Sequence, residues 1–232
     1  MQLPDSTVRA AGRSAWIAAW AGVILSPIHA LSRFATEEGR EDLESSSRFW
    51  AEPAAERVRP LLDWADPHTV YVTYGKGWLV LILAATVCAF LVRGTRRPHG
   101  LERVAWPVAL TGLTLETVSV AGDYYTPWID ESFLFIGLPG MLISLIGSLL
   151  LGIALLRRHY RPRMTAWLLV LSFPLMLVLS DLVAMGAAAL PTLFAWGLAG
   201  RAMAADSRHR LVVAGRAPAT PRAGRTSTGA PE

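Results

Sequence analysis

The fold is decided by residues 104–156, which read VAWPVALTGLTLETVSVAGDYYTPWIDESFLFIGLPGMLISLIGSLLLGIALL. Two apolar runs flank a short acidic segment, residues 122–132, and each run is long enough to cross a bilayer as a helix. The pattern predicts a membrane hairpin. Its first arm carries Glu116, which is the most informative residue of the chain because an ionisable side chain at membrane depth is costly unless it is partnered or hydrated.

The composition of the whole chain is typical of a membrane protein. Of its 232 residues, 53% are hydrophobic and 17% are charged, and the mean hydropathy is +0.37. The formal charge of +4 comes with no basic face of interleaved aromatic residues, so we expect no nucleic-acid partner. The single cysteine, Cys88, excludes an internal disulfide and a cysteine-based zinc cluster, and we expect neither a metal site nor a cofactor.

Further apolar runs on both sides extend the hairpin to six predicted helices. They are residues 14–31, residues 71–92, the two arms of the hairpin, and two helices within residues 164–203, divided at Ser180 and Asp181. The sequence therefore predicts an all-α fold, a polytopic transmembrane helix bundle of about six spans. A cleaved signal peptide is the alternative interpretation of the first run, because HALS at residues 29–32 resembles a cleavage site.

The domain boundaries follow from this assignment. We expect a cytoplasmic head at residues 1–13, a membrane domain at 14–203 and a disordered cytoplasmic tail at 204–232, because the tail has few bulky apolar groups.

The charges of the connections predict the orientation of the bundle. Residues 93–103 and residues 157–163 contain four arginines each, which indicates the cytoplasmic side. Residues 33–70 contain nine acidic residues against five arginines, and residues 122–132 are also acidic, so both are expected outside. The longer external connection is expected to contain short amphipathic helices, one near Thr36 and one opened by Pro53, with a solvated loop of local helicity as the alternative. Both termini then lie in the cytoplasm of a multi-pass plasma-membrane protein.

The second arm of the hairpin carries a small residue at every fourth position. The positions are Gly140, Ser144, Ser148 and Gly152. Such a stripe is typical of a face on which another helix packs closely in lipid. Three prolines, Pro107, Pro174 and Pro191, fall inside predicted helices and are expected to kink them or to leave backbone carbonyls free near a cavity.

Polar side chains collect in the outer half of the predicted bundle. They are His29, Tyr74, Lys76, Glu116 and Asp181. We expect a polar pocket open to the outside, in which Glu116 pairs with Lys76 or contacts a ligand. The alternative for Lys76 and Asp181, and equally for His29, is that these side chains reach the lipid headgroups.

These features favour a non-catalytic integral membrane protein that binds a ligand or serves as an accessory component. Its expected partners are the lipid bilayer and either a small molecule or another membrane protein. The alternative is a proton-coupled or small-solute carrier that uses Glu116. A carrier also needs a polar route to the cytoplasm, and the inner halves of the predicted helices offer few polar groups.

Three stretches carry a resemblance to a group of uncharacterised bacterial six-span membrane proteins. They are DPHTVYVTYGKGW (66–78), FLFIGLPGMLISLIGSLLLGIALLRR (133–158) and LPTLFAWGLAGRAM (190–203). The resemblance implies the fold and brings no activity with it.

A shorter stretch, PWIDESFLF (127–135), resembles the small membrane-bound carotenoid cyclases, in which paired carboxylates precede a phenylalanine-rich helix start. The resemblance implies a membrane enzyme in which Asp130 and Glu131 would protonate a polyene and stabilise cationic charge. This chain has Asp where that pattern has Glu. Adjacent acids at a helix start are also typical of an ordinary N-terminal turn.

Overall fold

The structure, a computed structural model, describes residues 4–44 and 46–216, and within these ranges the chain forms helices and no strands. The helices are α1 (Asp5–Phe34), α2 (Ala51–Arg57), α3 (Arg59–Leu62), α4 (Pro67–Gly94), α5 (Leu101–Tyr125), α6 (Ile129–Ser132), α7 (Leu138–Arg157), α8 (Arg163–Val170), α9 (Ser172–Leu182) and α10 (Leu190–Arg216). Shorter helical segments are η1 (Glu41–Glu44), η2 (Ser46–Arg48), η3 (Phe133–Gly137) and η4 (Met185–Ala189).

Four helical rods in the described ranges are long and apolar enough to cross a membrane. They are α1, α4, α5 and the continuous η3–α7 rod, with mean hydropathies between 1.4 and 2.2. Helices α8 and α9 would together form a fifth span, bent by 66°. The all-α fold with several candidate membrane-spanning helices is therefore confirmed for the described residues, whereas the expected count of six spans is not. Helix α10 is long enough to span but less apolar, because Arg201 and Asp206 lie within it.

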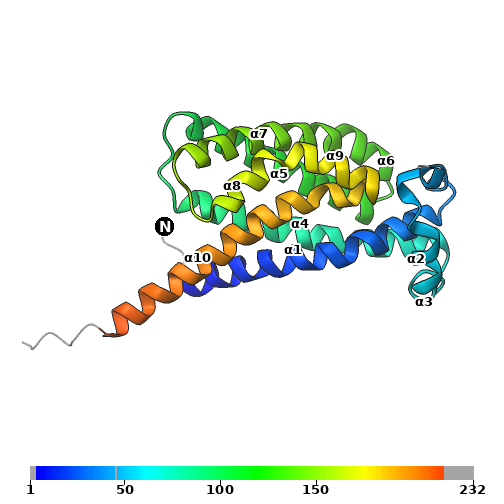
Figure 1. The fold of residues 1–232 in the computed structure, drawn as a ribbon, viewed down its shortest axis with the longest axis horizontal. Coiled ribbons are helices and arrows are strands. Elements are labelled where there is room, and N and C mark those ends of the chain that lie inside the picture. The colour runs from blue at the N-terminus through cyan, green and yellow to red at the C-terminus, as the bar shows by residue number, and fades with distance from the viewer. Residues whose placement is uncertain (1–3, 45, 217–232) are drawn as a thin grey trace, which may run out of the picture.

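The long helices form one bundle (Figure 1). Helix α1 packs along α10 and α4, α5 packs along α7, and α8 contacts both α7 and α10. One end of the bundle contains the start of α1 and the end of α10. The connection between α4 and α5 and the connection between α7 and α8 lie at the same end. Helices α2, α3 and α6 lie at the other end. The arginine-rich connections are thus separated from the acidic ones by the length of the bundle.

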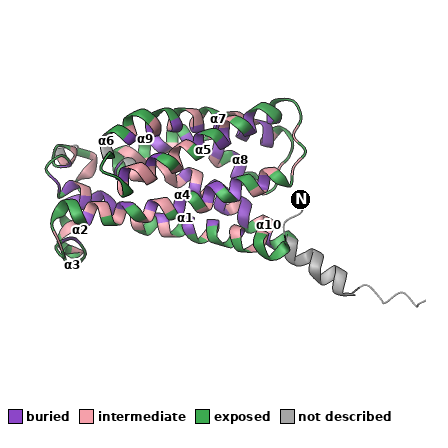
Figure 2. Cartoon of the chain, turned by 180° about the vertical axis from the view of Figure 1, so that it is seen from behind, coloured by how far each residue is buried: buried purple, intermediate pink, exposed green. Residues whose placement is uncertain are grey.

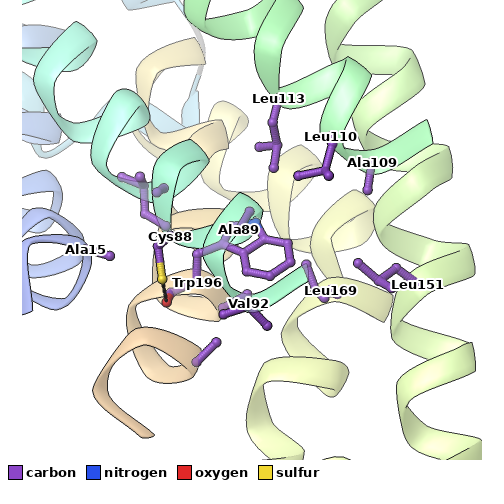
Figure 3. Close-up of a cluster of buried hydrophobic side chains, with 14 of the residues drawn as sticks. Ala15, Cys88, Ala89, Val92, Ala109, Leu110, Leu113, Leu151, Leu169 and Trp196 are labelled. Carbon is purple, nitrogen blue, oxygen red and sulfur yellow. Dashed lines mark hydrogen bonds between the residues drawn. The ribbon is translucent and has the colours of Figure 1, made fainter. Parts of the chain in front are cut away.

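Figure 2 shows buried and exposed positions alternating along each long helix of the bundle. Many of the exposed positions carry large apolar side chains. Figure 3 shows the Trp196 ring of α10 among side chains from α4, α5, α7 and α8. Cys88 is fully buried beside it, and its Sγ donates to the Trp196 carbonyl at 3.4 Å. Large side chains on the outside, such as Ile24 at 67% exposed and Val80 at 63%, suit contact with lipid.

Helices α5 and α7 run antiparallel in a constant register. A Cβ added at Gly112 would overlap the backbone of Ser144, and one added at Gly147 would overlap the backbone of Ala109. Moving three residues toward the N-terminus of α5, from Gly112 to Ala109, moves the contact three residues toward the C-terminus of α7, from Ser144 to Gly147. The two backbones therefore approach closely wherever a glycine removes the side chain on one side.

The small-residue stripe of α7 contacts two neighbouring helices. Ser144 and Ser148 are 3% and 2% exposed, and Ser144 lies against α5. A Cβ added at Gly152 would instead lie 2.8 Å from the carbonyl oxygen of Ala166 in α8. The stripe thus lets α5 and α8 approach the same helix at different heights.

The three prolines have different consequences. Pro174 separates α8 from α9, because it has no N–H to donate to the carbonyl of Val170 and its ring clashes with that carbonyl. The helix resumes where Leu175 N donates to Leu171 O at 3.0 Å. Pro107 lies inside the continuous helix α5. The expected kink at Pro191 is wrong, because this residue lies in the first turn of α10, where a missing N–H breaks no helical bond.

Both chain ends are more helical than expected. Helix α1 begins at Asp5, so most of the expected head at residues 1–13 belongs to the first helix. Helix α10 continues to Arg216, so the expected disorder does not begin at residue 204. Alanine is common in this part of α10 and favours the helix even where bulky apolar groups are few. Residues 217–232 lie outside the described part of the chain.

Candidate functional site

The expected external connection folds into a cap on the end of α1. Ala51 of α2 and Leu62 of α3 are buried in one apolar cluster with Leu31 and Phe34 of α1. Short helices thus form here, and the buried Ala51 and Leu62 cover the last turn of α1, but the single helix expected from Pro53 onward is divided at Val58 into α2 and α3.

Side-chain hydrogen bonds tie the cap to the bundle. The Tyr74 hydroxyl of α4 donates to the carbonyl of Leu61 at 2.8 Å. The Trp50 indole donates to the carbonyl of Leu182 at 2.7 Å, at the end of α9. Two of the residues expected to line a pocket, Tyr74 and Asp181, thus lie at the contact between the cap and the bundle instead. Asp181 itself is exposed, and its backbone carbonyl accepts a hydrogen bond from the cap.

The first turn of α4, which follows the cap in the chain, is stabilised by an N-terminal side-chain hydrogen bond. The Asp66 carboxylate accepts a hydrogen bond from Thr69 N at 2.9 Å, directly before Pro67 at the first position of the helix. Hydrogen bonds from Thr69 lower the pKa of the Asp66 carboxyl below its usual value, so it stays ionised at neutral pH.

A cavity of about 300 Å³ lies between the end of α1 and the cap helices. Its apolar wall comprises Leu31, Phe34, Leu43 and Leu62, together with small alanine side chains. Its volume is at the lower limit of ordinary small-molecule sites, which are likewise mostly apolar.

The charged part of the cavity lining is acidic. It consists of Glu52, Glu56, Arg59 and Asp63. Arg59 Nε lies 2.7 Å from the Asp63 carboxylate, so the one arginine is already paired with one of the three acids. The cavity therefore combines an apolar wall with a net negative charge, which suits an apolar molecule that carries a cationic group.

His29 belongs to a packed aromatic cluster that joins α1, α4 and α5. The Tyr124 hydroxyl lies 3.0 Å from His29 Nε2 and 3.3 Å from the Tyr71 hydroxyl. The Tyr71 ring stacks on the imidazole at 4.9 Å, and Trp78 meets it edge-on at 6.2 Å. His29 is only 5% exposed. Its place is thus in the interior of the bundle.

Glu116 and Lys76 lie at different depths. Thr117 Oγ1 of α5 lies 3.1 Å from Thr86 Oγ1 of α4, so Glu116 is level with the middle of α4. Lys76 is ten residues before Thr86, or about 15 Å away along the helix. Its ammonium group lies over the Tyr125 ring at 5.6 Å. The expected pairing of Glu116 with Lys76 is therefore wrong.

Glu116 lies instead at the contact between α5 and α7. Its side chain lies near Ser144, one residue of the small stripe. Gly140, one turn before Ser144, gives it room, since a Cβ added there would lie 3.1 Å from Glu116 N. The polar group expected to face a pocket is thus accommodated by the neighbouring helix.

We expect Glu116→Gln to change the free energy of unfolding by less than about 1 kcal/mol, because the amide keeps the size and shape of the side chain and Glu116 forms no ion pair within the described residues. Equilibrium unfolding in mixed micelles measures this. Combined with Lys76→Met, the two effects should add, because residues without a shared contact are not coupled. A loss of about 3 kcal/mol or more would instead indicate a charged partner for Glu116.

The two carboxylates of the cyclase-like stretch are only partly described. Glu131 is exposed in α6, and the side chain of Asp130 lies outside the described residues. Helix α6 is held to α5 by Ser132, whose hydroxyl donates to the Ser119 carbonyl at 3.1 Å.

The other end of the bundle contains a buried ionic cluster that we did not predict. The Glu102 side chain is 0% exposed, and its carboxylate lies 2.5 Å from Arg96 Nε and 3.2 Å from Arg158 Nη1. Trp106 Nε1 donates to the same carboxylate at 3.1 Å. The sequence feature from which this cluster could have been predicted is a single acid among the eight arginines of the two connections, followed one turn later by a tryptophan.

Within residues 4–44 and 46–216, no three His, Cys, Asp or Glu side chains lie close enough together to hold a metal ion. Comparison with protein families, with curated proteins and with solved structures finds no match to this chain.

Proposed function

We propose that this protein is a non-catalytic, multi-pass plasma-membrane protein that binds a small amphipathic cation in the cavity beneath its cap. The cavity itself carries the proposal: an apolar wall from α1 and α3 lies beside three carboxylates and one arginine. An apolar body would pack on Leu31 and Phe34, and a cationic group would face Glu52 and Glu56. Such a site needs no reacting group.

In the proposed orientation the cap lies outside the cell. The two arginine-rich connections stay in the cytoplasm, as the distribution of arginine in membrane proteins favours. Helices α8 and α9 form one broken span and α10 a sixth, so both termini are cytoplasmic. The cavity is then at the outer membrane surface, where an amphipathic molecule concentrates.

The carrier and enzyme alternatives have less support. From Glu116 toward the arginine-rich end, the facing positions of α5 and α7 are small and uncharged, such as Gly112 opposite Ser144 and Ala109 opposite Gly147. A proton route through this contact would need polar groups there. The enzyme alternative relies on Asp130 and Glu131 in a helix of a single turn, where Glu131 is exposed.

We expect Leu62→Trp to weaken binding of hexyltrimethylammonium at least about tenfold, which corresponds to about 1.4 kcal/mol, because the larger ring fills the cavity. Titration calorimetry on protein in phosphatidylcholine nanodiscs measures the affinity. The control is Leu61→Trp in the same helix, since Leu61 is 45% exposed and does not line the cavity.

Hexanol serves as the uncharged comparison ligand. It should bind more weakly than the cation, because it lacks the charge that faces the carboxylates. No measurable binding of the cation, or equal loss in both tryptophan variants, would show that the cavity is not its site.

A further inference from the structure

Two connections far apart in sequence meet at the arginine-rich end of the bundle. Arg158, at the end of α7, donates from Nη2 to the carbonyl of His99 at 3.4 Å, and it also pairs with Glu102. Arg96 approaches Glu102 from the other connection. The four arginines of residues 93–103 and the four of residues 157–163 therefore gather at one end.

Most of this positive charge is exposed. We call the exposed arginines of the two connections that have no ion pair in the described structure the arginine surface. They are Arg97, Arg103, Arg157, Arg161 and Arg163. The one acid of these connections, Glu102, is buried and already paired with two other arginines. The arginine surface therefore has no neutralising partner within its own connections.

The arginine surface borders the part of the protein that faces lipid. Arg103 is followed by Val104, which is 59% exposed, and Arg163 is followed by Met164, which is 58% exposed. Trp167, one turn along α8, is 48% exposed, and tryptophan favours the interface between hydrocarbon and headgroups. The guanidinium groups are thus at the depth of the lipid phosphates.

We propose that the arginine surface binds the headgroups of anionic phospholipids in the adjacent leaflet. A guanidinium group can donate two parallel hydrogen bonds to a phosphate, which a lysine ammonium cannot do in the same geometry. Every basic residue of the two connections other than histidine is arginine. Basic clusters beside membrane helices attract anionic lipid, and the buried Glu102 cluster holds these two connections together as one surface.

Native mass spectrometry of the purified protein, released from nanodiscs of equal phosphatidylglycerol and phosphatidylcholine, tests this proposal. We expect the wild type to retain at least about three times more phosphatidylglycerol than phosphatidylcholine. The double variant Arg103→Gln, Arg157→Gln should lose this preference. The control, Arg40→Gln with Arg57→Gln, removes the same charge from exposed residues of the cap and should keep the preference.

Two outcomes would overturn the proposal. Equal retention of the two lipids by the wild type means that the surface does not select anionic headgroups, and equal loss in both double variants means that only net charge matters. A separate titration with inorganic phosphate in phosphatidylcholine nanodiscs distinguishes a soluble anion. Phosphate binding that requires Arg103 and Arg157, without any lipid preference, would assign the surface to soluble phosphate instead.

Discussion

Glu102→Ala is expected to lower the free energy of unfolding by about 3 kcal/mol, the lower limit of the loss usual when one partner of a buried ion pair is removed. The carboxylate is fully buried and accepts from Trp106 as well as facing Arg96 and Arg158. The two arginines are 21% and 37% exposed, so water can hydrate them partly once the acid is gone. Trp106 Nε1 is buried and would lose its acceptor, which adds to the cost.

Equilibrium unfolding in mixed micelles measures this loss, with Glu38→Ala as the control. Glu38 is exposed beside the cap at the opposite end of the bundle, and its removal should cost less than about 0.5 kcal/mol. Adding Arg96→Met to Glu102→Ala should recover part of the loss, because it removes a charge that has lost its partner. The double-mutant cycle of these two changes isolates their interaction. A loss below about 1 kcal/mol for Glu102→Ala would mean that the carboxylate is effectively solvated.

Glu102 has a role beyond its own stability. It lies at the start of α5 and pairs with one arginine from the connection before it and one from the connection after α7. The ring of Tyr160 also packs against the Arg96 guanidinium, at 5.0 Å. If these contacts hold the two connections together, Glu102→Ala should also weaken the preference for phosphatidylglycerol, although it removes no arginine.

The sequence predicted the features that depend on the length and polarity of single segments. The hairpin of residues 104–156 forms α5 and α7, because two apolar runs joined by a short polar connection can only return antiparallel. The arginine content of the connections correctly grouped those at one end of the bundle. Whether α10 spans the membrane was harder to predict, since its length suits a span while Arg201 and Asp206 lower its hydropathy.

The positions of polar side chains were less predictable, because depth in the membrane does not determine which face of a helix a residue occupies. Glu116 and Lys76 were expected to meet, but their helices place them about 15 Å apart along the bundle. His29 and Tyr124, which are 95 residues apart in sequence, do meet. Contacts of this kind depend on which face of α1, α4 and α5 is turned toward the other helices. No pattern within a single segment of the sequence specifies this.

The cap illustrates the same limit. A helix here could be predicted from Pro53 and the apolar residues after it, since periodic apolar positions require a surface to cover, but its division at Val58 could not. The surface that they cover is the end of α1, with Leu31 and Phe34. The cavity lies where α2 and α3, which meet at Val58, face the end of that helix.

Gly112→Leu is expected to cost about 3 kcal/mol or more, above the usual range for overpacking, because the atoms that a side chain would meet belong to the backbone of Ser144. A flexible side chain could move aside, whereas the α7 backbone can yield only if the helix shifts as a unit. The register of α5 on α7 would change with it, and Gly147 would separate from Ala109.

The sign of the smaller change, Gly112→Ala, separates packing from intrinsic helix propensity. Alanine is better than glycine inside a helix by about 1 kcal/mol, so propensity alone predicts stabilisation. The matched control is Gly94→Ala at the end of α4, where an added Cβ meets nothing within 4 Å, and this variant should be neutral or slightly stabilised. Gly112→Ala should be destabilised in the same unfolding assay, and Gly112→Leu more so. If both Gly112 variants were as stable as the wild type, α5 and α7 could not lie in the close contact that brings Ser144 to Glu116.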